Sequence, residues 1–280
     1  MNRIKSIFVM AFFTLLMVVS IQAVSHLAAG FSLGWLGALL ASAPMLLVLG
    51  LVMLGRKLPV DQSRLTVVAL TMASGGLLAA FDWLFRAGST VAAGMAGLCL
   101  AAYAIYQTWY SRLDRSATRI EKGQPLPEFS ALNLDEKPVY SRDLLGKPAL
   151  LMFYRGNWCP FCVVQVKELA KAYRELGDRA RIVLISPQPA HKTRELAARF
   201  EVRFDYWVDP DNQVATVLGI NQDQGLPAGM QVLGYESDTV LPTCIVLAAD
   251  GTVLDVDETE NYRDRPEPDF LARVLEQHGL

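Results

Sequence analysis

Four long apolar stretches fill the first 110 residues of the chain and leave few ways for this half to fold. Each is close to the roughly 20 residues that an α-helix needs to cross the hydrocarbon core of a bilayer. Few ionisable side chains interrupt them; Asp82 lies near the end of the third. The pattern therefore predicts an all-α transmembrane region of four helices over residues 1–110. The stretches are Ile7–Val24, Leu33–Leu54, Leu65–Phe85 and Thr90–Tyr110.

Basic residues flank these stretches mostly on one side. Nine lie before the first stretch, between the second and third, or after the fourth, whereas the other side has only Arg86. Under the positive-inside rule, this bias predicts a multi-pass protein of the plasma (inner) membrane with its N-terminus and everything after residue 110 in the cytoplasm. If the first stretch is instead a cleaved signal peptide, three spans that begin outside still end inside. The nine are Arg3, Lys5, Arg56, Lys57, Arg64, Arg112, Arg115, Arg119 and Lys122.

Residues 111–280 differ sharply from the apolar half. They hold 20 of the 26 basic and 26 of the 28 acidic residues, a net charge of 20 − 26 = −6. An acidic domain is a poor ligand for a phosphate backbone, so we expect no nucleic-acid partner. Residues 111–124 are charged and are predicted to form a linker or a helical extension. Residues 125–280 are enough for one domain with its own core.

Strand and helix patterns alternate along this second half, which predicts an α/β layer structure. A hairpin is expected at Leu132–Leu134 and Pro138–Tyr140, because turn-forming residues separate two short strands. The further strands are expected at Ala149–Tyr154, Arg181–Ser186, Tyr206–Asp209, Thr243–Ala248 and Thr252–Asp255. The helices are expected at Pro160–Leu176, Lys192–Phe200, Gln213–Leu218 and Pro268–His278.

Cys159 and Cys162 form a CxxC pair directly after the apolar run Ala149–Tyr154 and at the start of the helix expected from Pro160. The unpaired N–H groups of a helix N-terminus stabilise a thiolate and lower a cysteine pKa. The thiolate is the nucleophilic form of cysteine, and a second thiol can resolve a mixed disulfide. We therefore predict that these two residues are catalytic.

These motifs together resemble the alkyl hydroperoxide reductase/thiol-specific antioxidant (AhpC/TSA) group of peroxiredoxin-like proteins, which have the thioredoxin fold. The resemblance covers about residues 124–278 and implies a C-terminal thioredoxin-like redox domain. The matching segments are Leu126–Phe129, Phe153–Cys162, Asp209–Asp211, Leu241–Thr243 and Tyr262–Pro268.

The resemblance leaves two registers for the cysteines. In the peroxiredoxin pattern P-x-x-x-T-x-x-C, the attacking cysteine is Cys162, but Arg155 and Cys159 replace the proline and the threonine. The arginine that such enzymes place before a later strand corresponds to Leu241. In the thioredoxin register, Cys159 attacks and Cys162 resolves. The position of Cys159 at the helix start predicts that it is the more exposed thiol.

Five further residues are predicted to support the dithiol. Arg155 would stabilise a thiolate electrostatically or lie as a solvated charge at a strand end. Trp158 is expected at a partly exposed rim with Pro160, and Pro242 as a cis-proline beside Thr243 that faces the dithiol. A structural disulfide or a zinc site would use the same cysteines, but a three-residue loop gains little from a crosslink and no second ligand pair is present. We expect no cofactor and no metal.

The resemblance implies a membrane-anchored antioxidant enzyme that reduces a hydroperoxide through a dithiol/disulfide cycle. A thioredoxin-like protein or glutathione would be the electron donor. One alternative is a thioredoxin-like reductase or isomerase that acts on a protein disulfide. Another is a non-catalytic redox sensor or assembly factor, in which the dithiol state changes the contacts of the helices in the lipid bilayer.

Overall fold

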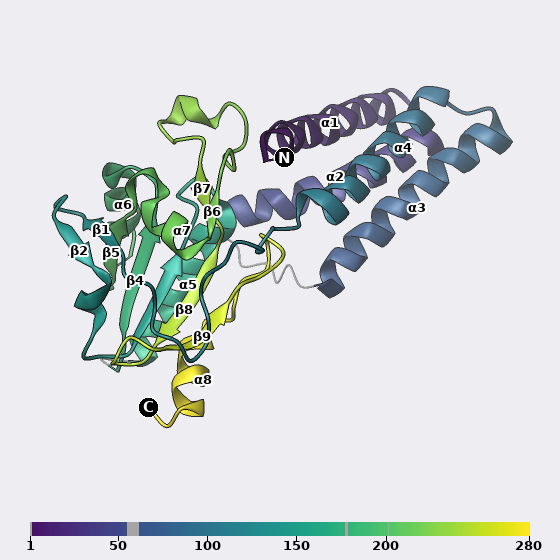
Figure 1. The fold of residues 1–280 in the computed structure, drawn as a ribbon. Helices are drawn as coiled ribbons and strands as arrows, with labels where there is room; N and C mark the ends of the chain where they lie inside the picture. Colours follow the sequence, from purple (N-terminus) through teal and green to yellow (C-terminus); the bar gives the residue numbers. More distant parts are fainter. Residues whose placement is uncertain (1, 55–61, 177–178, 201) are drawn as a thin grey trace. The chain divides into compact units, whose positions relative to one another are not determined.

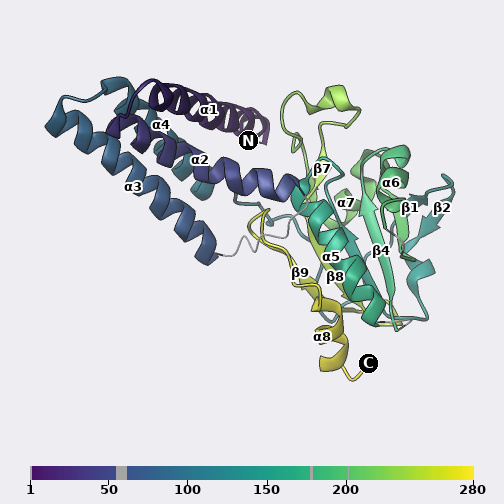
Figure 2. The same cartoon turned by 180° about the vertical axis from the view of Figure 1, so that it is seen from behind.

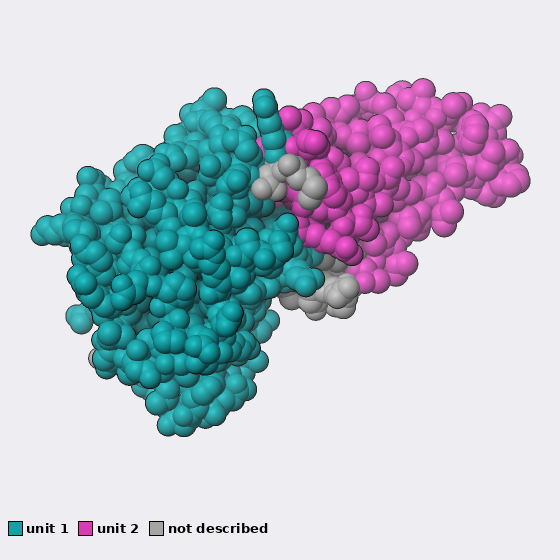
Figure 3. All heavy atoms as spheres, viewed as in Figure 1, with its two compact units in different colours: residues 1–3, 113–280 teal, residues 4–112 magenta. Residues whose placement is uncertain are grey.

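A computed structural model describes residues 2–54, 62–176, 179–200 and 202–280. The chain divides into two compact units, one of residues 4–112 and one built mainly of residues 113–280. Figure 3 shows the first unit in magenta and the second in teal. Each unit has its own packed interior and is described separately below.

The first unit is all-helical. Its described part contains α1 (Asn2–Ala29), α2 (Leu33–Met53), α3 (Gln62–Arg86), α4 (Thr90–Ile105) and a π-helical turn η1 (Tyr106–Tyr110). Each of the four long helices holds a window long and apolar enough for a membrane span. The prediction of four such helices is confirmed; Arg56 and Lys57, which contribute to the charge bias, lie outside the described residues.

Small residues let α2 and α3 approach closely. A Cβ atom on Gly37 would lie 2.6 Å from the carbonyl oxygen of Gly75, and a Cβ atom on Gly75 would lie equally close to Gly37. In lipid, such close backbone approach is a main source of helix association. At the start of α2, the buried carboxylate of Asp82 accepts a hydrogen bond from the Gly34 amide at 3.0 Å. Asp82 thus satisfies one of the amides that a helix N-terminus leaves unpaired.

The second unit is built on a seven-stranded sheet in the order β2-β1-β5-β4-β3-β8-β9. Its centre is parallel (β5, β4, β3), β8 is antiparallel to β3, β9 is antiparallel to β8, and β1 and β2 form the expected hairpin. The strands are β1 (Ser130–Asn133), β2 (Pro138–Tyr140), β3 (Ala149–Phe153), β4 (Arg181–Ser186), β5 (Asp205–Val208), β8 (Thr243–Leu247) and β9 (Val253–Asp257). A separate two-stranded sheet pairs β6 (Asn221–Gln222) with β7 (Thr239–Val240).

Helices cover both faces of the main sheet (Figures 1 and 2). On one face α5, α6 and α8 pack against Leu150 and Met152. On the other, α7 and the segment before β1 pack against Leu151 and Phe153. Successive side chains of a strand point to opposite faces, so a strand buried on both faces needs a continuous apolar run, and β3 has one. The helices are α5 (Pro160–Leu176), α6 (Ala190–Ala197), α7 (Gln213–Leu218) and α8 (Phe270–Gln277), with short 3₁₀ turns η2 (Ser141–Leu144), η3 (Pro210–Asn212) and η4 (Met230–Leu233).

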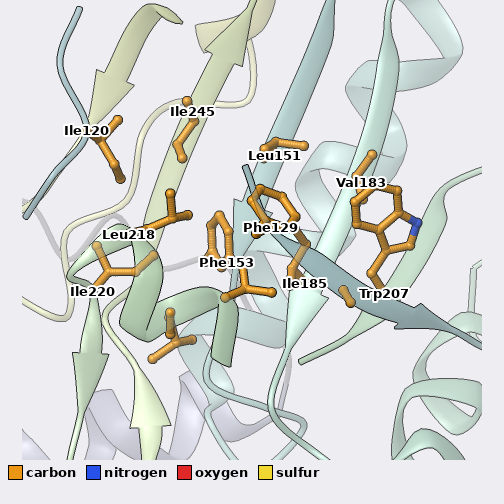
Figure 4. Close-up of a cluster of buried hydrophobic side chains, with 14 of the residues drawn as sticks. Ile120, Phe129, Leu151, Phe153, Val183, Ile185, Trp207, Leu218, Ile220 and Ile245 are labelled. Atoms are coloured by element: carbon orange, nitrogen blue, oxygen red, sulfur yellow. The ribbon is translucent and has the colours of Figure 1, made fainter. Parts of the chain in front are cut away.

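Figure 4 shows the core on the α7 side of the sheet. Phe129 and Phe153 lie near its centre, Trp207 lies at one end, and Ile120 and Leu218 lie at the other. Every predicted strand and helix of this half is present within a few residues, which confirms the α/β thioredoxin-like prediction. The small β6–β7 sheet was not predicted.

Residues 111–124 differ from the expected linker or helical extension. They contain no helix, and from Leu113 onward they lie along the second unit. The Leu113 amide donates to the Glu260 carbonyl (2.7 Å), the Arg119 amide donates to the Leu218 carbonyl (3.0 Å), and Ile120 is buried. Backbone pairing with distant segments takes the place of helical hydrogen bonds in this stretch.

Candidate active site

The dithiol lies on the turn that joins β3 to α5. Gly156 in this turn has φ +136°, and a Cβ atom there would lie 2.9 Å from the Trp158 indole and 3.1 Å from the Gln188 side-chain oxygen. Only glycine fits this position. The Cys159 amide donates to the Gly156 carbonyl, and α5 begins with Pro160, where a missing N–H costs nothing.

The two predicted catalytic cysteines lie together. Their Sγ atoms are 2.9 Å apart, and both thiols are free. Cys159 is 2% exposed and Cys162 is 0% exposed. Cys159 is thus the more exposed of the two, as predicted, but the difference is small because both residues are buried.

The two thiols differ in charge environment. Burial opposes a thiolate at Cys162, but several groups outweigh burial and lower its pKa to about 5. These are the hydrogen bond with Cys159, the Arg265 guanidinium and the Arg155 amide and side chain. The Nη2 atom of Arg265 is 3.8 Å from the Cys162 Sγ atom. A cation at this distance favours the charged form of a thiol.

At Cys159 the balance is the opposite. Burial, the hydrogen bond to Cys162 and the neighbouring negative charge raise the pKa of Cys159 well above its ordinary value. The opposite shifts of the two pKa values favour the thiolate at Cys162 and the protonated thiol at Cys159. The sequence-based argument for Cys159 as the thiolate considered only the helix N-terminus and lacked Arg265.

Arg155 is buried rather than a solvated strand-end charge, with 5% exposure. Its Nη2 atom donates to the Gly225 carbonyl (2.7 Å) and to the Gln222 side-chain oxygen (3.2 Å). Its Cζ atom lies 4.7 Å from the Trp158 ring centre and 6.0 Å from that of Tyr262. Trp158 is half-buried, and its indole N–H donates to the Arg155 carbonyl.

Gln188, which sequence reasoning missed, fixes the turn before the dithiol. This buried side chain accepts from the Asn157 amide (2.8 Å) and donates toward Tyr154, Asn157 and Thr193. Asn157 also donates to the Lys192 carbonyl (2.6 Å). A satisfied buried network of this kind holds the turn in one geometry.

Pro242 and Thr243 lie where β8 begins, and Thr243 pairs with Phe153 at the end of β3. The prediction of a cis-proline is wrong: no peptide bond in the described residues is cis. Arg115 binds this segment, with Nη2 donating to the Pro242 carbonyl and Nη1 to the Thr243 hydroxyl (2.8 Å). The trans form is the preferred isomer of an X–Pro bond.

Cys244 belongs to the same hydrophobic cluster as the dithiol. Burial and the carboxylate of Asp257 raise its pKa to about 12, so it is a neutral core thiol. The Gln165 side-chain amide approaches its Sγ atom at 3.5 Å. Within the described residues, no cluster of His, Cys, Asp and Glu side chains is placed to hold a metal ion.

Arg265 and Arg115 are the two important residues that sequence reasoning did not assign to the site. Arg265 lies in the segment Tyr262–Pro268, which contributed to the family resemblance, so a signal for its region existed. Its Nη1 atom donates to the carbonyl oxygens of Tyr262 and Asp264, which orient the guanidinium. Arg115 appeared only as a flanking charge of the membrane region, and nothing in the sequence linked it to Thr243.

Comparison with known proteins agrees with this geometry. Residues 122–256 match the model of the AhpC/TSA family. A putative peroxiredoxin, bcp, of Haemophilus influenzae is 29% identical over 143 residues, which cover 51% of this chain and 88% of that protein. The thiol-disulfide oxidoreductase ResA of Bacillus cereus is 22% identical over 175 residues, covering 61% of this chain and 87% of that protein.

The crystal structure of peroxidoxin BcpB from Mycobacterium tuberculosis resembles the second unit, with a TM-score of 0.43 and 24% identity. The match covers 56% of this chain and 96% of the other. Residues 122–256 of this chain are therefore similar to the AhpC/TSA family, and the relatives named above are a putative peroxiredoxin and a thiol-disulfide oxidoreductase.

Proposed function

We propose that the protein is a membrane-anchored antioxidant enzyme that reduces hydroperoxides with the Cys159/Cys162 dithiol. One observation carries the proposal: the Cys162 thiolate has a guanidinium on one side and a protonated thiol 2.9 Å away on the other. This arrangement supplies a nucleophile, a positive charge and a resolving thiol at one place. A two-step peroxide reduction needs these three components.

In the first step, the Cys162 sulfur attacks one peroxide oxygen, the O–O bond breaks, and the leaving alkoxide takes a proton to become an alcohol. Cys162 becomes a sulfenic acid. The Cys159 sulfur then forms an S–S bond to Cys162, and the sulfenic oxygen leaves as water with the Cys159 proton. Arg265 lies where it would stabilise negative charge on the leaving oxygen. A dithiol donor, a thioredoxin-like protein or glutathione, would restore both thiols.

The test is the loss of thiols when the reduced full-length chain, in an uncharged detergent, is mixed with hydrogen peroxide. Cys99→Ser and Cys244→Ser in all samples remove the two other thiols, so that only the pair is counted. Cys162→Ser should abolish rapid loss. Cys159→Ser should keep the first step and stop at a sulfenic acid that dimedone traps. Thiol loss no faster than that of a free small thiol would reject the peroxidase.

A thioredoxin-like reductase or isomerase for protein disulfides is the second candidate. Two observations favour it: a cysteine, Cys159, occupies the peroxiredoxin threonine position, and the relatives include thiol-disulfide oxidoreductases. In this case an external disulfide replaces the peroxide. Faster reduction of insulin disulfides than of hydrogen peroxide, per active site, would favour this candidate.

The four apolar helices support anchoring in a lipid bilayer, and the flanking charges favour a plasma (inner) membrane with the redox domain on the cytoplasmic side. A reducing compartment suits the cycle, because cytoplasmic donors return the disulfide to the dithiol. A non-catalytic sensor would keep the same topology but show negligible turnover in both assays.

A further inference from the structure

Arg155 and Arg265 place two guanidinium groups beside one thiolate. Both lower the pKa of Cys162, and the Arg265 Nη2 atom lies 3.8 Å from its sulfur. Both guanidinium groups lie near Tyr262: the Arg155 Cζ atom is 6.0 Å from the centre of that ring, and Arg265 donates to the Tyr262 carbonyl. The two cations therefore share one small region next to the dithiol.

Neither guanidinium is matched by a paired carboxylate. Among the described residues, Arg155 and Arg265 form no ion pair, and the Nε atom of each is buried without a hydrogen-bond partner. Burial raises the pKa of Asp257, whereas the positive charges of Arg265 and Arg115 both act to lower it, so this carboxyl group is shared between two arginines. Arg155 is hydrogen-bonded only to neutral oxygens, those of Gly225 and Gln222. A buried cation of this kind is costly without a counter-charge.

The thiolate supplies that counter-charge only while the pair is reduced. When Cys159 and Cys162 form a disulfide, one negative charge disappears and both guanidinium groups stay. The oxidised site therefore gains one net positive charge relative to the reduced site. An anion that approaches at this stage is attracted to the site, even though the domain as a whole carries a charge of 20 − 26 = −6.

We propose that the oxidised site selects an anionic thiol as its electron donor, a thiol that carries a carboxylate, with Arg155 binding the carboxylate. This inference rests on the proposed dithiol cycle and names the chemical class of its reductant. The donor thiolate attacks the Cys159 sulfur, the S–S bond breaks, and Cys162 leaves as a thiolate. A second donor thiolate attacks the mixed disulfide, which yields the oxidised donor and the Cys159 sulfur, which takes up a proton.

The direction of attack follows from the same charges. The sulfur with the lower pKa is the better leaving group, and that sulfur is Cys162 beside Arg265. Attack at Cys159 also places the donor on the Trp158 side of the pair, where the Arg155 guanidinium stacks on the indole at 4.7 Å. The Arg155 Nε–H group, which is buried without a hydrogen-bond partner, is the group that would pair with a carboxylate of the incoming thiol.

The test compares three small thiols as reductants of the oxidised full-length chain: 3-mercaptopropionate, neutral 2-mercaptoethanol and cationic cysteamine. The disulfide is prepared with diamide, which needs no peroxidase activity, in a background of Cys99→Ser and Cys244→Ser. Rates are measured by alkylation and mass shift, at equal thiolate concentration in an uncharged detergent. We expect the anionic thiol to react about 10-fold faster than the neutral one, as one nearby unit charge predicts, with cysteamine slowest.

Arg155→Gln should remove the difference in rate between the anionic, neutral and cationic thiols. Arg155→Lys should keep this difference because the positive charge is retained. Arg273→Gln, at an exposed arginine of α8, is the matched control and should leave the order unchanged. The order in the unsubstituted chain is informative even where a variant folds poorly. Equal rates for the three thiols, a faster cationic thiol, or an unchanged preference in Arg155→Gln would overturn the inference. Failure of diamide to join Cys159 and Cys162 would overturn the cycle itself.

Discussion

At the scale of single residues, the site shows how two thiols in one helical turn acquire opposite roles. Both lie near the N-terminus of α5, so the helix dipole acts on both. A group outside the helix contributes to the difference, because the Arg265 guanidinium is hydrogen-bonded to the Cys162 sulfur, although its charge acts on both thiols. The proton that leaves Cys162 stays on Cys159, where burial and the neighbouring negative charge raise the pKa. The choice of nucleophile thus depends in part on a residue 103 positions further along the chain.

The pH dependence of the peroxide reaction follows from this assignment. Because the pKa of Cys162 is lowered to about 5, the thiolate fraction rises as pH increases through 5 and is nearly complete at neutral pH. The rate of thiol loss should rise through the same range and level off below pH 7. The lowered pKa also contributes folding stability that is present at high pH and lost as pH falls through 5. A rate that instead rises above pH 8 would indicate an unperturbed thiol.

Replacement of Arg265 should raise the pKa of Cys162. Arg265→Met removes the guanidinium next to the sulfur and keeps an unbranched apolar side chain in its place, so we expect a shift of about one to two pH units. Ultraviolet absorbance of the thiolate near 240 nm, titrated with acid in Cys99→Ser/Cys244→Ser chains, measures this shift directly. Arg273→Met is the exposed control. An unchanged titration curve would show that Arg265 does not lower the pKa of Cys162.

At the scale of elements, Arg115 connects two segments that are far apart in the sequence. The residue precedes the first strand, yet its three guanidinium nitrogens bind the Thr259 carbonyl, the Pro242 carbonyl and the Thr243 hydroxyl. Burial lowers the pKa of Arg115 to about 10, so it is still charged at neutral pH. Hydrogen bonds from a charged donor are worth about 1.5–3 kcal/mol each. This residue therefore positions the start of β8 against the end of β3.

Loss of Arg115 should loosen the segment Leu241–Thr243 without altering the dithiol itself. In Arg115→Met we expect faster amide hydrogen exchange at this segment and a loss of about 2–4 kcal/mol in unfolding free energy, for three lost bonds with partial solvent compensation. Arg119→Met is the matched control, since that side chain is exposed and only its backbone is bonded. Equal exchange rates in the two variants would show that Arg115 does not position the segment.

The comparison with the sequence is most instructive at this scale. The ends of α5, α7 and β4 are where the sequence predicts them. Each element has a clear local periodicity and is bounded by a proline or a glycine. The contacts of Arg265 and Arg115 join residues more than 100 positions apart, and no local pattern encodes such contacts. Local rules therefore predicted the scaffold and the dithiol but not the charges that decide which thiol ionises.

At the scale of the whole molecule, one chain combines a four-helix apolar unit with an acidic redox domain. The side of the membrane on which the domain lies decides its chemistry. In the cytoplasm, donors keep the pair reduced and ready to attack a peroxide. In an oxidising compartment, the pair would rest as a disulfide and the same site would serve as an oxidant of other thiols.

A pair of reporters fused at residue 280 distinguishes the two cases. Nine basic residues against one predict a cytoplasmic C-terminus, so a green fluorescent reporter should be bright and an alkaline phosphatase inactive. Fusion after Gly88, in the segment between α3 and α4, should give the opposite result and serves as the control. An active phosphatase at residue 280 would place the domain outside the cytoplasm. The disulfide would then oxidise other thiols, with Cys162 still the leaving thiolate because Arg265 stays beside it on either side of the membrane.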